Sequence, residues 1–328
     1  MNKIIRKLFY LLFPIFVIFV AIVYCVDNSS YNVYNDDLEK KITEFTKPKY
    51  DYTLVIAGDS RAERQLVPDI ILSKYNIKSI NIATSACSVS NMYNALKKYD
   101  LLDKQITVVV SVGFFQINDG AIDTGYISMA EIISMSLKDK FILFANDIGG
   151  LYRNYLNALQ ENIVNFFIKA PFRLKENDER LEHHGFKPID GSINLPLDFS
   201  TDSENTKHSW YKNINVYGVR WKNMQSTLNK MSKSNCKFIL FQAPVSDAFK
   251  KHVNGTNIDR YEKEFSNMLQ QEADKYNNIE FYDFYSRSLS NLTNDDYYDP
   301  QHLNRFGAEK FTILLMDEIK NKLHNTSK

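Results

Sequence analysis

A serine stands where the first apolar run of the chain ends. The run Tyr52–Ala57 is followed by Gly58-Asp59-Ser60-Arg61, and an apolar run bounded by turn residues is typical of a buried strand. Ligands of α/β sheets bind beyond the carboxyl ends of the strands. A helix that starts behind the turn would offer free N–H groups and the positive end of its dipole to an oxyanion. Ser60 is therefore a candidate nucleophile.

A second motif stands near the other end of the chain, in the stretch Tyr298-Asp299-Pro300-Gln301-His302. An aspartate can fix the tautomer of a nearby histidine through one ring nitrogen while the other ring nitrogen faces a serine. Asp299 and His302 are therefore candidates for the orienting acid and the general base.

Each motif has an ordinary structural interpretation as well. Ser60 with Glu63 fits a capping box, in which the serine only ends a helix. Asp299 followed by Pro300 fits a helix N-cap with proline at the first helical position. Either motif alone is weak evidence, and the two together are more specific.

Short apolar runs alternate with stretches of helical character, which predicts parallel strands in a three-layer α/β/α sandwich. The predicted strands are Tyr52–Ala57, Ser79–Ile82, Ile106–Val112, Lys237–Ala243 and Ile279–Phe284. The predicted helices are Asn91–Leu102, Tyr217–Met231, Ile258–Lys275 and Arg305–Leu323. Between Ile117 and Lys212 no strand is recognisable and Ser128–Phe172 has helical character, so we expect a helical insertion at about 120–212 that shapes a substrate groove.

The N-terminal segment predicts a membrane anchor. Leu8–Val26 is an uninterrupted apolar run of about the length that a bilayer-spanning helix requires. Basic residues precede it, which favours a cytoplasmic N-terminus, and no small-residue cleavage site follows it. We expect residues 1–27 to form a cytoplasmic stub and transmembrane anchor, 28–49 a polar tether, and 50–328 a catalytic domain outside the cytoplasm.

Composition excludes some classes of protein. The formal net charge of +1 does not indicate binding to nucleic acid. The three cysteines cannot form a disulfide framework, and Cys87 and Cys236 are expected to be buried. The adjacent His183 and His184 have poor spacing for a metal pair, so no metal site is expected. No cofactor is expected either.

The two chemical motifs together resemble the SGNH/GDSL hydrolase superfamily, over about Tyr52 to Leu323. The anchored layout resembles the branch that contains the D-alanine-transfer protein of teichoic acid synthesis and the alginate O-acetylation proteins. The resemblance implies a flavodoxin-like α/β/α fold. It also implies an acyl-serine mechanism in which Ser60 attacks, His302 acts as base and then as acid, and Asp299 orients His302.

The chain departs from the family pattern at the expected oxyanion hole. Besides the Ser60 N–H, the family uses a glycine in its second block, and here Ala86 stands at that position. The asparagine of the third block is replaced by Phe115, so we consider Gln116 or Asn118 as a substitute donor. Losing one such donor typically costs roughly 10²–10³ in rate.

We therefore expect an O-acyl esterase or O-acyltransferase that acts on a glycan or glycopolymer outside a bacterial cell membrane. An integral membrane acyltransferase is an expected partner by analogy with the family. Two alternatives stay open: a non-catalytic binding or scaffold protein that keeps the fold, and a soluble lipase released by signal cleavage.

Overall fold

The computed structural model describes residues 36–85, 87–119, 177–192, 211 and 214–323, with a few residues of the N-terminal stretch. The chain divides into two compact units, and the fold below is that of the unit formed by Asn35–Gly125 and Phe172–Lys328. Most of the predicted anchor Leu8–Val26, and all of Ser128–Phe172, lie outside the described residues. Within the described ranges, no helix combines the length and the apolar character that crossing a membrane requires.

A parallel sheet forms the centre of this unit, and it confirms each predicted strand to within two residues at either end. The strands are β1 (Leu54–Ala57), β2 (Ser79–Asn81), β3 (Thr107–Val112), β4 (Lys237–Gln242) and β5 (Ile279–Asp283). Their order across the sheet is β2-β1-β3-β4-β5, the flavodoxin-like order. The order reverses between β1 and β3, where Val55 pairs with Val108. Such a switch point is where an open α/β sheet binds its ligand.

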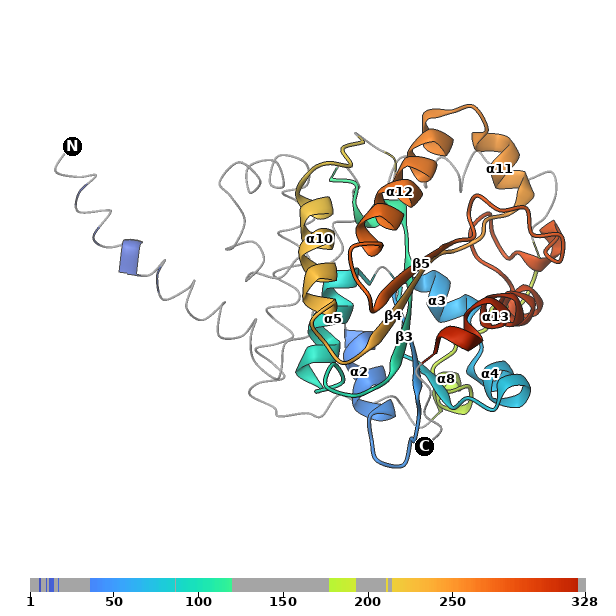
Figure 1. The fold of residues 1–328 in the computed structure, drawn as a ribbon, viewed down its shortest axis with the longest axis horizontal. Helices are drawn as coiled ribbons and strands as arrows, with labels where there is room; N and C mark the ends of the chain where they lie inside the picture. Colours follow the sequence, from blue (N-terminus) through green and yellow to red (C-terminus); the bar gives the residue numbers. More distant parts are fainter. Residues whose placement is uncertain are drawn as a thin grey trace. The chain divides into compact units, whose positions relative to one another are not determined.

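Helices cover both faces of the sheet, which confirms a three-layer α/β architecture (Figure 1). One layer contains α2 (Asp36–Phe45), α5 (Val89–Lys98), α10 (Val219–Met231) and α12 (Asn257–Ala273). The opposite layer contains α3 (Ser60–Gln65), α4 (Pro68–Tyr75) and α13 (Arg305–Ile319). Two further helices are α8 (Glu179–Glu182) and α11 (Asp247–Val253).

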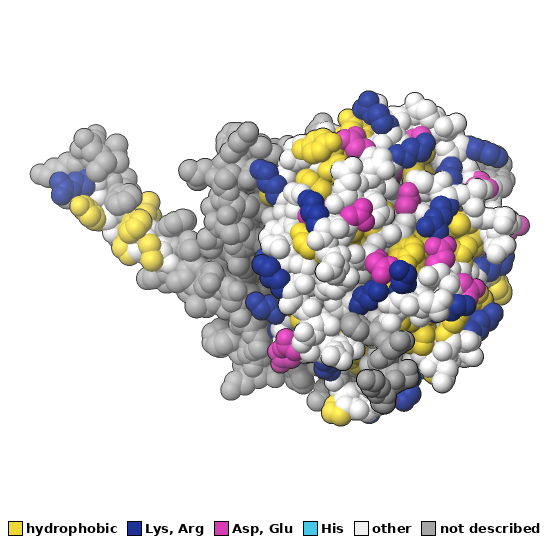
Figure 2. Space-filling view, viewed as in Figure 1, with side chains coloured by type: hydrophobic (Ala, Val, Ile, Leu, Met, Phe, Trp, Pro, Cys, Tyr) yellow, Lys and Arg dark blue, Asp and Glu magenta, His cyan; other side chains and the backbone are white. Residues whose placement is uncertain are grey.

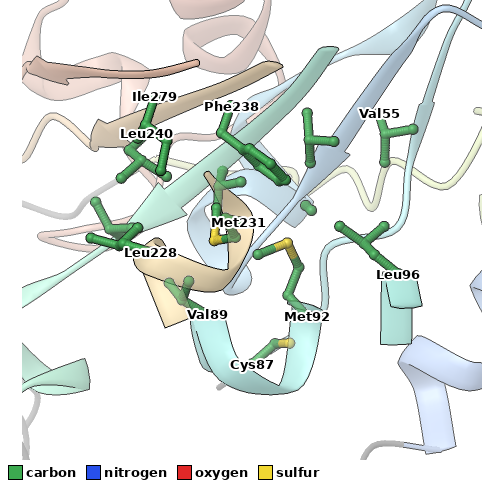
Figure 3. Close-up of a cluster of buried hydrophobic side chains, with 14 of the residues drawn as sticks. Val55, Cys87, Val89, Met92, Leu96, Leu228, Met231, Phe238, Leu240 and Ile279 are labelled. Carbon is green, nitrogen blue, oxygen red and sulfur yellow. The ribbon is translucent and has the colours of Figure 1, made fainter. Parts of the chain in front are cut away.

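The larger core lies between the sheet and the first of these layers (Figure 3). Cys87 lies there among apolar side chains, close to Val89 and Met92 (Figure 3). Cys87 and Cys236 are both buried and free, as predicted, and burial raises the pKa of the Cys87 thiol to about 12. Trp221 also packs in this core.

The predicted tether is wrong over part of its length. Residues Asp36–Phe45 form α2, and Leu38, Ile42 and Phe45 are buried in the core. These residues recur at spacings of four and three, which places them on one face of a helix. The folded domain therefore begins at residue 36 or earlier, and not at residue 50.

On the face visible in Figure 2, basic and acidic side chains are interspersed over the described part of the surface. This distribution agrees with the balanced formal charge of the chain. The described part of this face therefore does not carry the continuous basic stripe typical of nucleic-acid binding.

Candidate active site

The turn after β1 places Ser60 at the carboxyl edge of the sheet. Gly58 has φ +112°, and a Cβ there would lie 2.4 Å from the Ser111 hydroxyl and 2.8 Å from the Ser111 backbone. Only glycine fits such a turn without strain. The chain can therefore leave β1 sharply, and α3 starts at Ser60, two residues later.

The capping-box interpretation of Ser60 is wrong. The N-cap of α3 is Asp59, whose carboxylate accepts a hydrogen bond from the Arg61 N–H at 3.0 Å. Because Asp59 caps the helix, the Ser60 hydroxyl is free to point elsewhere. The N–H of Ser60 is at the first helical position and has no intrahelical acceptor.

Asp59 is also the centre of a buried polar network below the turn. Its carboxylate accepts hydrogen bonds from Ser111 Oγ at 2.8 Å and Gln116 Nε2 at 3.2 Å, and it forms an ion pair with Arg61. Its own N–H donates to Ser111 Oγ at 2.9 Å. Burial raises the pKa of Asp59, but the charge and hydrogen bonds of Arg61, with the Ser111 bond, outweigh it and hold that pKa below its usual range. The network fixes the residue immediately before Ser60.

Arg61, the residue after Ser60, is buried. Its guanidinium lies over the Phe115 ring at 5.4 Å, and a Cβ on Gly113 would lie 1.9 Å from Arg61 Nη2. The charge therefore fills the space at the end of β3, and Gly113 leaves room for it.

We expect Asp59→Asn to lower the stability of the fold by about 3–5 kcal/mol, because the Arg61 charge would stay buried without its counter-charge. For a domain of this size that is a decrease in Tm of about 6–20 °C by thermal unfolding. Asp51 is a matched control because it pairs with Lys78 on the exposed surface, and Asp51→Asn is expected to lower Tm by about 2 °C or less. Equal Tm values for the two variants would contradict the role given to Asp59.

The histidine lies in a tight loop between Tyr297 and Leu303, which are joined by an isolated antiparallel bridge. Both bridge residues are buried. Gln65 Nε2, at the end of α3, donates to the Gln301 carbonyl at 2.9 Å, and the Ser246 N–H donates to the Pro300 carbonyl at 3.0 Å. The loop is thus attached to the helix that carries Ser60 and to the segment after β4.

The N-cap interpretation of Asp299 is also wrong. α13 starts at Arg305, and its N-cap is Asn304, which accepts from the Gly307 N–H at 3.0 Å. Asp299 instead accepts the N–H groups of Gln301 and His302, each at 2.8 Å.

Ser60, His302 and Asp299 come together in one chain of hydrogen bonds. The distance between Ser60 Oγ and His302 Nε2 is 2.8 Å, and that between His302 Nδ1 and Asp299 Oδ2 is 2.7 Å. Burial raises the pKa of Asp299, but its hydrogen bond with His302, the charge of His302 and the two backbone N–H groups outweigh it and lower that pKa. An ionised Asp299 retains the proton on Nδ1 of neutral His302, so that Nε2 can accept the proton of Ser60.

The structure describes some of the predicted oxyanion donors and not others. Ala86 lies outside the described residues. Gln116 Nε2 donates to Asp59 and lies 3.5 Å from the Cys87 carbonyl, so its amide protons are directed at protein acceptors. Gln116, Asn118 and Ala86 as oxyanion donors therefore stay predictions, while the Ser60 N–H lies at the first helical position, where it has no intrahelical acceptor.

Glu262, a buried acid on α12, was not singled out from the sequence. It accepts hydrogen bonds from the Tyr211 hydroxyl and from Gln242 Nε2, the latter at 2.6 Å. Burial raises the pKa of Glu262 to about 7, against the opposing effects of these bonds and of the Arg61 charge. An isolated acidic residue in a helix gives no sequence signal for such a position.

Because the folded-state pKa of Glu262 is raised, protonation stabilises the fold at low pH, and this contribution is lost as pH rises through about 7. Glu262→Gln is expected to remove this loss, so that the fall in Tm between pH 5 and pH 8 becomes smaller than in the unsubstituted protein. Thermal unfolding at both pH values measures it. Glu264 on the same helix, whose partner is the exposed Tyr217, is the control. A fall as large in Glu262→Gln as in Glu264→Gln would contradict the prediction.

The paired histidines form a separate cluster at α4. His184 Nδ1 lies 2.9 Å and His183 Nδ1 3.5 Å from the Asp69 carboxylate. The Asp69 hydrogen bond raises the pKa of His184. Within the ranges that the structure describes, no group of three or more metal-ligating side chains is present.

Comparisons with known proteins give no family assignment. No family model matches the chain, and no curated protein matches it either. Among solved structures, a protein from Streptococcus pneumonia described as a candidate platelet activating factor has a TM-score of 0.40 and 11% identity, over 88% of this chain and 91% of its own. A lipase/acylhydrolase from Enterococcus faecalis has a TM-score of 0.40 and 14% identity, over 84% of this chain and 99% of its own. Likenesses at this level leave function to be argued from the geometry of the site.

Proposed function

We propose that this chain is a serine ester hydrolase or O-acyltransferase of SGNH type that works through an acyl-serine intermediate. One observation carries the proposal, namely the continuous hydrogen-bond chain from Ser60 Oγ through His302 to Asp299. A serine hydroxyl is a weak nucleophile until an adjacent base removes its proton, and a histidine oriented by a carboxylate is such a base.

The steps follow from these positions. Ser60 Oγ attacks the carbonyl carbon of an ester, and its proton passes to His302 Nε2. His302 then gives this proton to the leaving alcohol oxygen as the C–O bond breaks, which leaves the acyl group on Ser60. In the second half, water or a sugar hydroxyl loses a proton to His302 and attacks the acyl carbon, and the proton returns to Ser60 Oγ. The Ser60 N–H is positioned to donate to the oxyanion of each tetrahedral intermediate.

The substrate class and the location are further parts of the proposal and rest on the sequence. The apolar run Leu8–Val26 supports an anchored protein whose catalytic domain lies outside the cytoplasm. The acyl acceptor in that compartment is an envelope glycan or glycopolymer, and the proposed acyl source is an integral membrane acyltransferase. These assignments depend on the resemblance of the motifs to the anchored SGNH branch.

Pre-steady-state hydrolysis of p-nitrophenyl acetate tests the proposed chemistry. An acyl-serine intermediate predicts a burst of nitrophenolate close to one equivalent of protein when deacylation is slow. Addition of soluble glycan oligomers then separates the two outcomes, since a transferase gives acetylated oligomer and an esterase gives acetate. No nitrophenolate release above that of Ser60→Ala would contradict the proposal and favour the non-catalytic binding or scaffold protein.

A further inference from the structure

Lys41 in α2 is a fully buried cation that contacts α3, the helix that starts at Ser60. Its side chain has 0% exposure, and its Nζ lies 2.9 Å from Glu63 Oε1, which is also buried. The same Nζ donates to the Ala83 carbonyl at 2.5 Å. One ammonium group thus joins three segments: α2, the helix that starts at Ser60, and the loop that follows β2.

The loop after β2 is attached to the nucleophile segment at two further points. The Thr84 N–H donates to the Gly58 carbonyl at 3.1 Å. Ser85 Oγ donates to Glu63 Oε2 at 3.1 Å, so Glu63 connects the loop to Lys41. Residue 86 follows directly, at the position where an oxyanion donor is expected from the sequence.

A requirement for stability alone does not explain this choice of residues. Burying an ammonium group is costly, and burial lowers the pKa of Lys41 against the opposing charge of Glu63. Replacing a buried ion pair by apolar residues of similar volume is often neutral or stabilising. The pair instead fixes relative position, because its hydrogen bonds hold the Ala83 carbonyl in a defined place relative to Glu63. Glu63 lies three residues after Ser60.

We propose that Lys41 is a positioning residue for the reaction, which holds the loop at 83–85 in register with the nucleophile helix through Glu63 and the Ala83 carbonyl. The inference rests on the proposed acyl-serine function. Without Lys41 the helix and the nucleophile remain, but the loop loses its attachment at the Ala83 carbonyl, and only the contacts of Thr84 and Ser85 still hold it beside the turn at Gly58. Displacement of about 1 Å in such a site can cost about 10²-fold in rate.

Two variants and a matched control test the positioning role. Lys41→Met leaves Glu63 buried without a cation, so the double variant K41M/E63Q, which removes both charges, is made beside it. Lys98 is the control because its Nζ forms an ion pair with Glu39 of the same helix α2 at 2.8 Å. Lys98→Met weakens the attachment of α2 to α5 without touching the loop after β2.

We expect both Lys41 variants to lower kcat for p-nitrophenyl acetate by about 10²-fold at temperatures well below their Tm, with KM changed by less than about 3-fold. Lys98→Met is expected to keep kcat within about 3-fold of the unsubstituted protein. Unchanged kcat in folded K41M/E63Q, or an equal decrease in Lys98→Met, would overturn the positioning role.

Hydrogen exchange separates this inference from the proposed function. Faster amide exchange in residues 83–89 of the Lys41 variants than in Lys98→Met is expected whether or not the protein turns over an ester. Equal exchange in all variants would overturn the inference. Absence of turnover in the unsubstituted protein, with faster exchange in the Lys41 variants, would count against the acyl-serine function alone.

Discussion

Replacing Ser60 by alanine is expected to lower kcat for p-nitrophenyl acetate by about 10⁴–10⁶-fold, because the atom that forms the acyl bond is removed. The Ser60 hydroxyl is only part-buried and makes one side-chain hydrogen bond, to His302. The stability of the fold should therefore change by about 1 kcal/mol or less. Steady-state kinetics measures the rate, and thermal unfolding shows that the variant is folded.

Ser73 on α4 is the matched control for this substitution. Its hydroxyl is exposed and donates only to the Ile70 carbonyl of its own helix. Ser73→Ala should retain kcat within about 2-fold, as expected for a surface substitution. If folded Ser60→Ala retained more than about a tenth of the activity, another residue would have to be the nucleophile.

The second large effect is expected for Asp299→Asn, which should lower kcat by roughly 10⁴-fold. An asparagine can still accept the N–H groups of Gln301 and His302 that Asp299 Oδ1 accepts now. Its amide NH₂ would then face His302 Nδ1 and donate to it, and the ring proton would move to Nε2. A protonated Nε2 in a neutral ring cannot accept the proton of Ser60.

Asp295 provides the control, because it lies four residues before Asp299 and its side chain is exposed. Asp295→Asn should leave kcat within about 2-fold. Carbon-bound ring protons of His302, followed by NMR, report the tautomer directly. A wild-type tautomer together with normal kcat in Asp299→Asn would show that Asp299 does not orient the base.

Much of the fold follows from the sequence because buried parallel strands leave a strong signal. Each strand is a short apolar run, and β3 is buried at every position. The helix α2 was not predicted because its charged residues outnumber its apolar ones. Its buried face is recognised only when Leu38, Ile42 and Phe45 are seen to recur at helical spacing. Short helices such as α3 contain too few turns to show periodicity.

The parts of the site that were predictable are those that chemistry restricts to a few residue types. Ser60 lies 239 or more positions before Asp299 and His302 in the sequence. Each of the three residues nevertheless belongs to a motif that can be recognised from its neighbours along the chain. Lys41 and Ser111 act through contacts made only in the folded chain, so nothing in their local sequence indicates them. For the same reason, the local sequence does not indicate that the Gln116 amide protons are directed at Asp59 and the Cys87 carbonyl.

The most direct test of the account is to locate the residue modified by a fluorophosphonate, which reacts with serines activated as nucleophiles. Peptide mass spectrometry of the labelled protein should find one phosphonyl group on the peptide that contains Ser60, and His302→Gln should label far more slowly. Label on a different residue, or none on protein shown to be folded, would contradict the central claim that Ser60 is activated through His302.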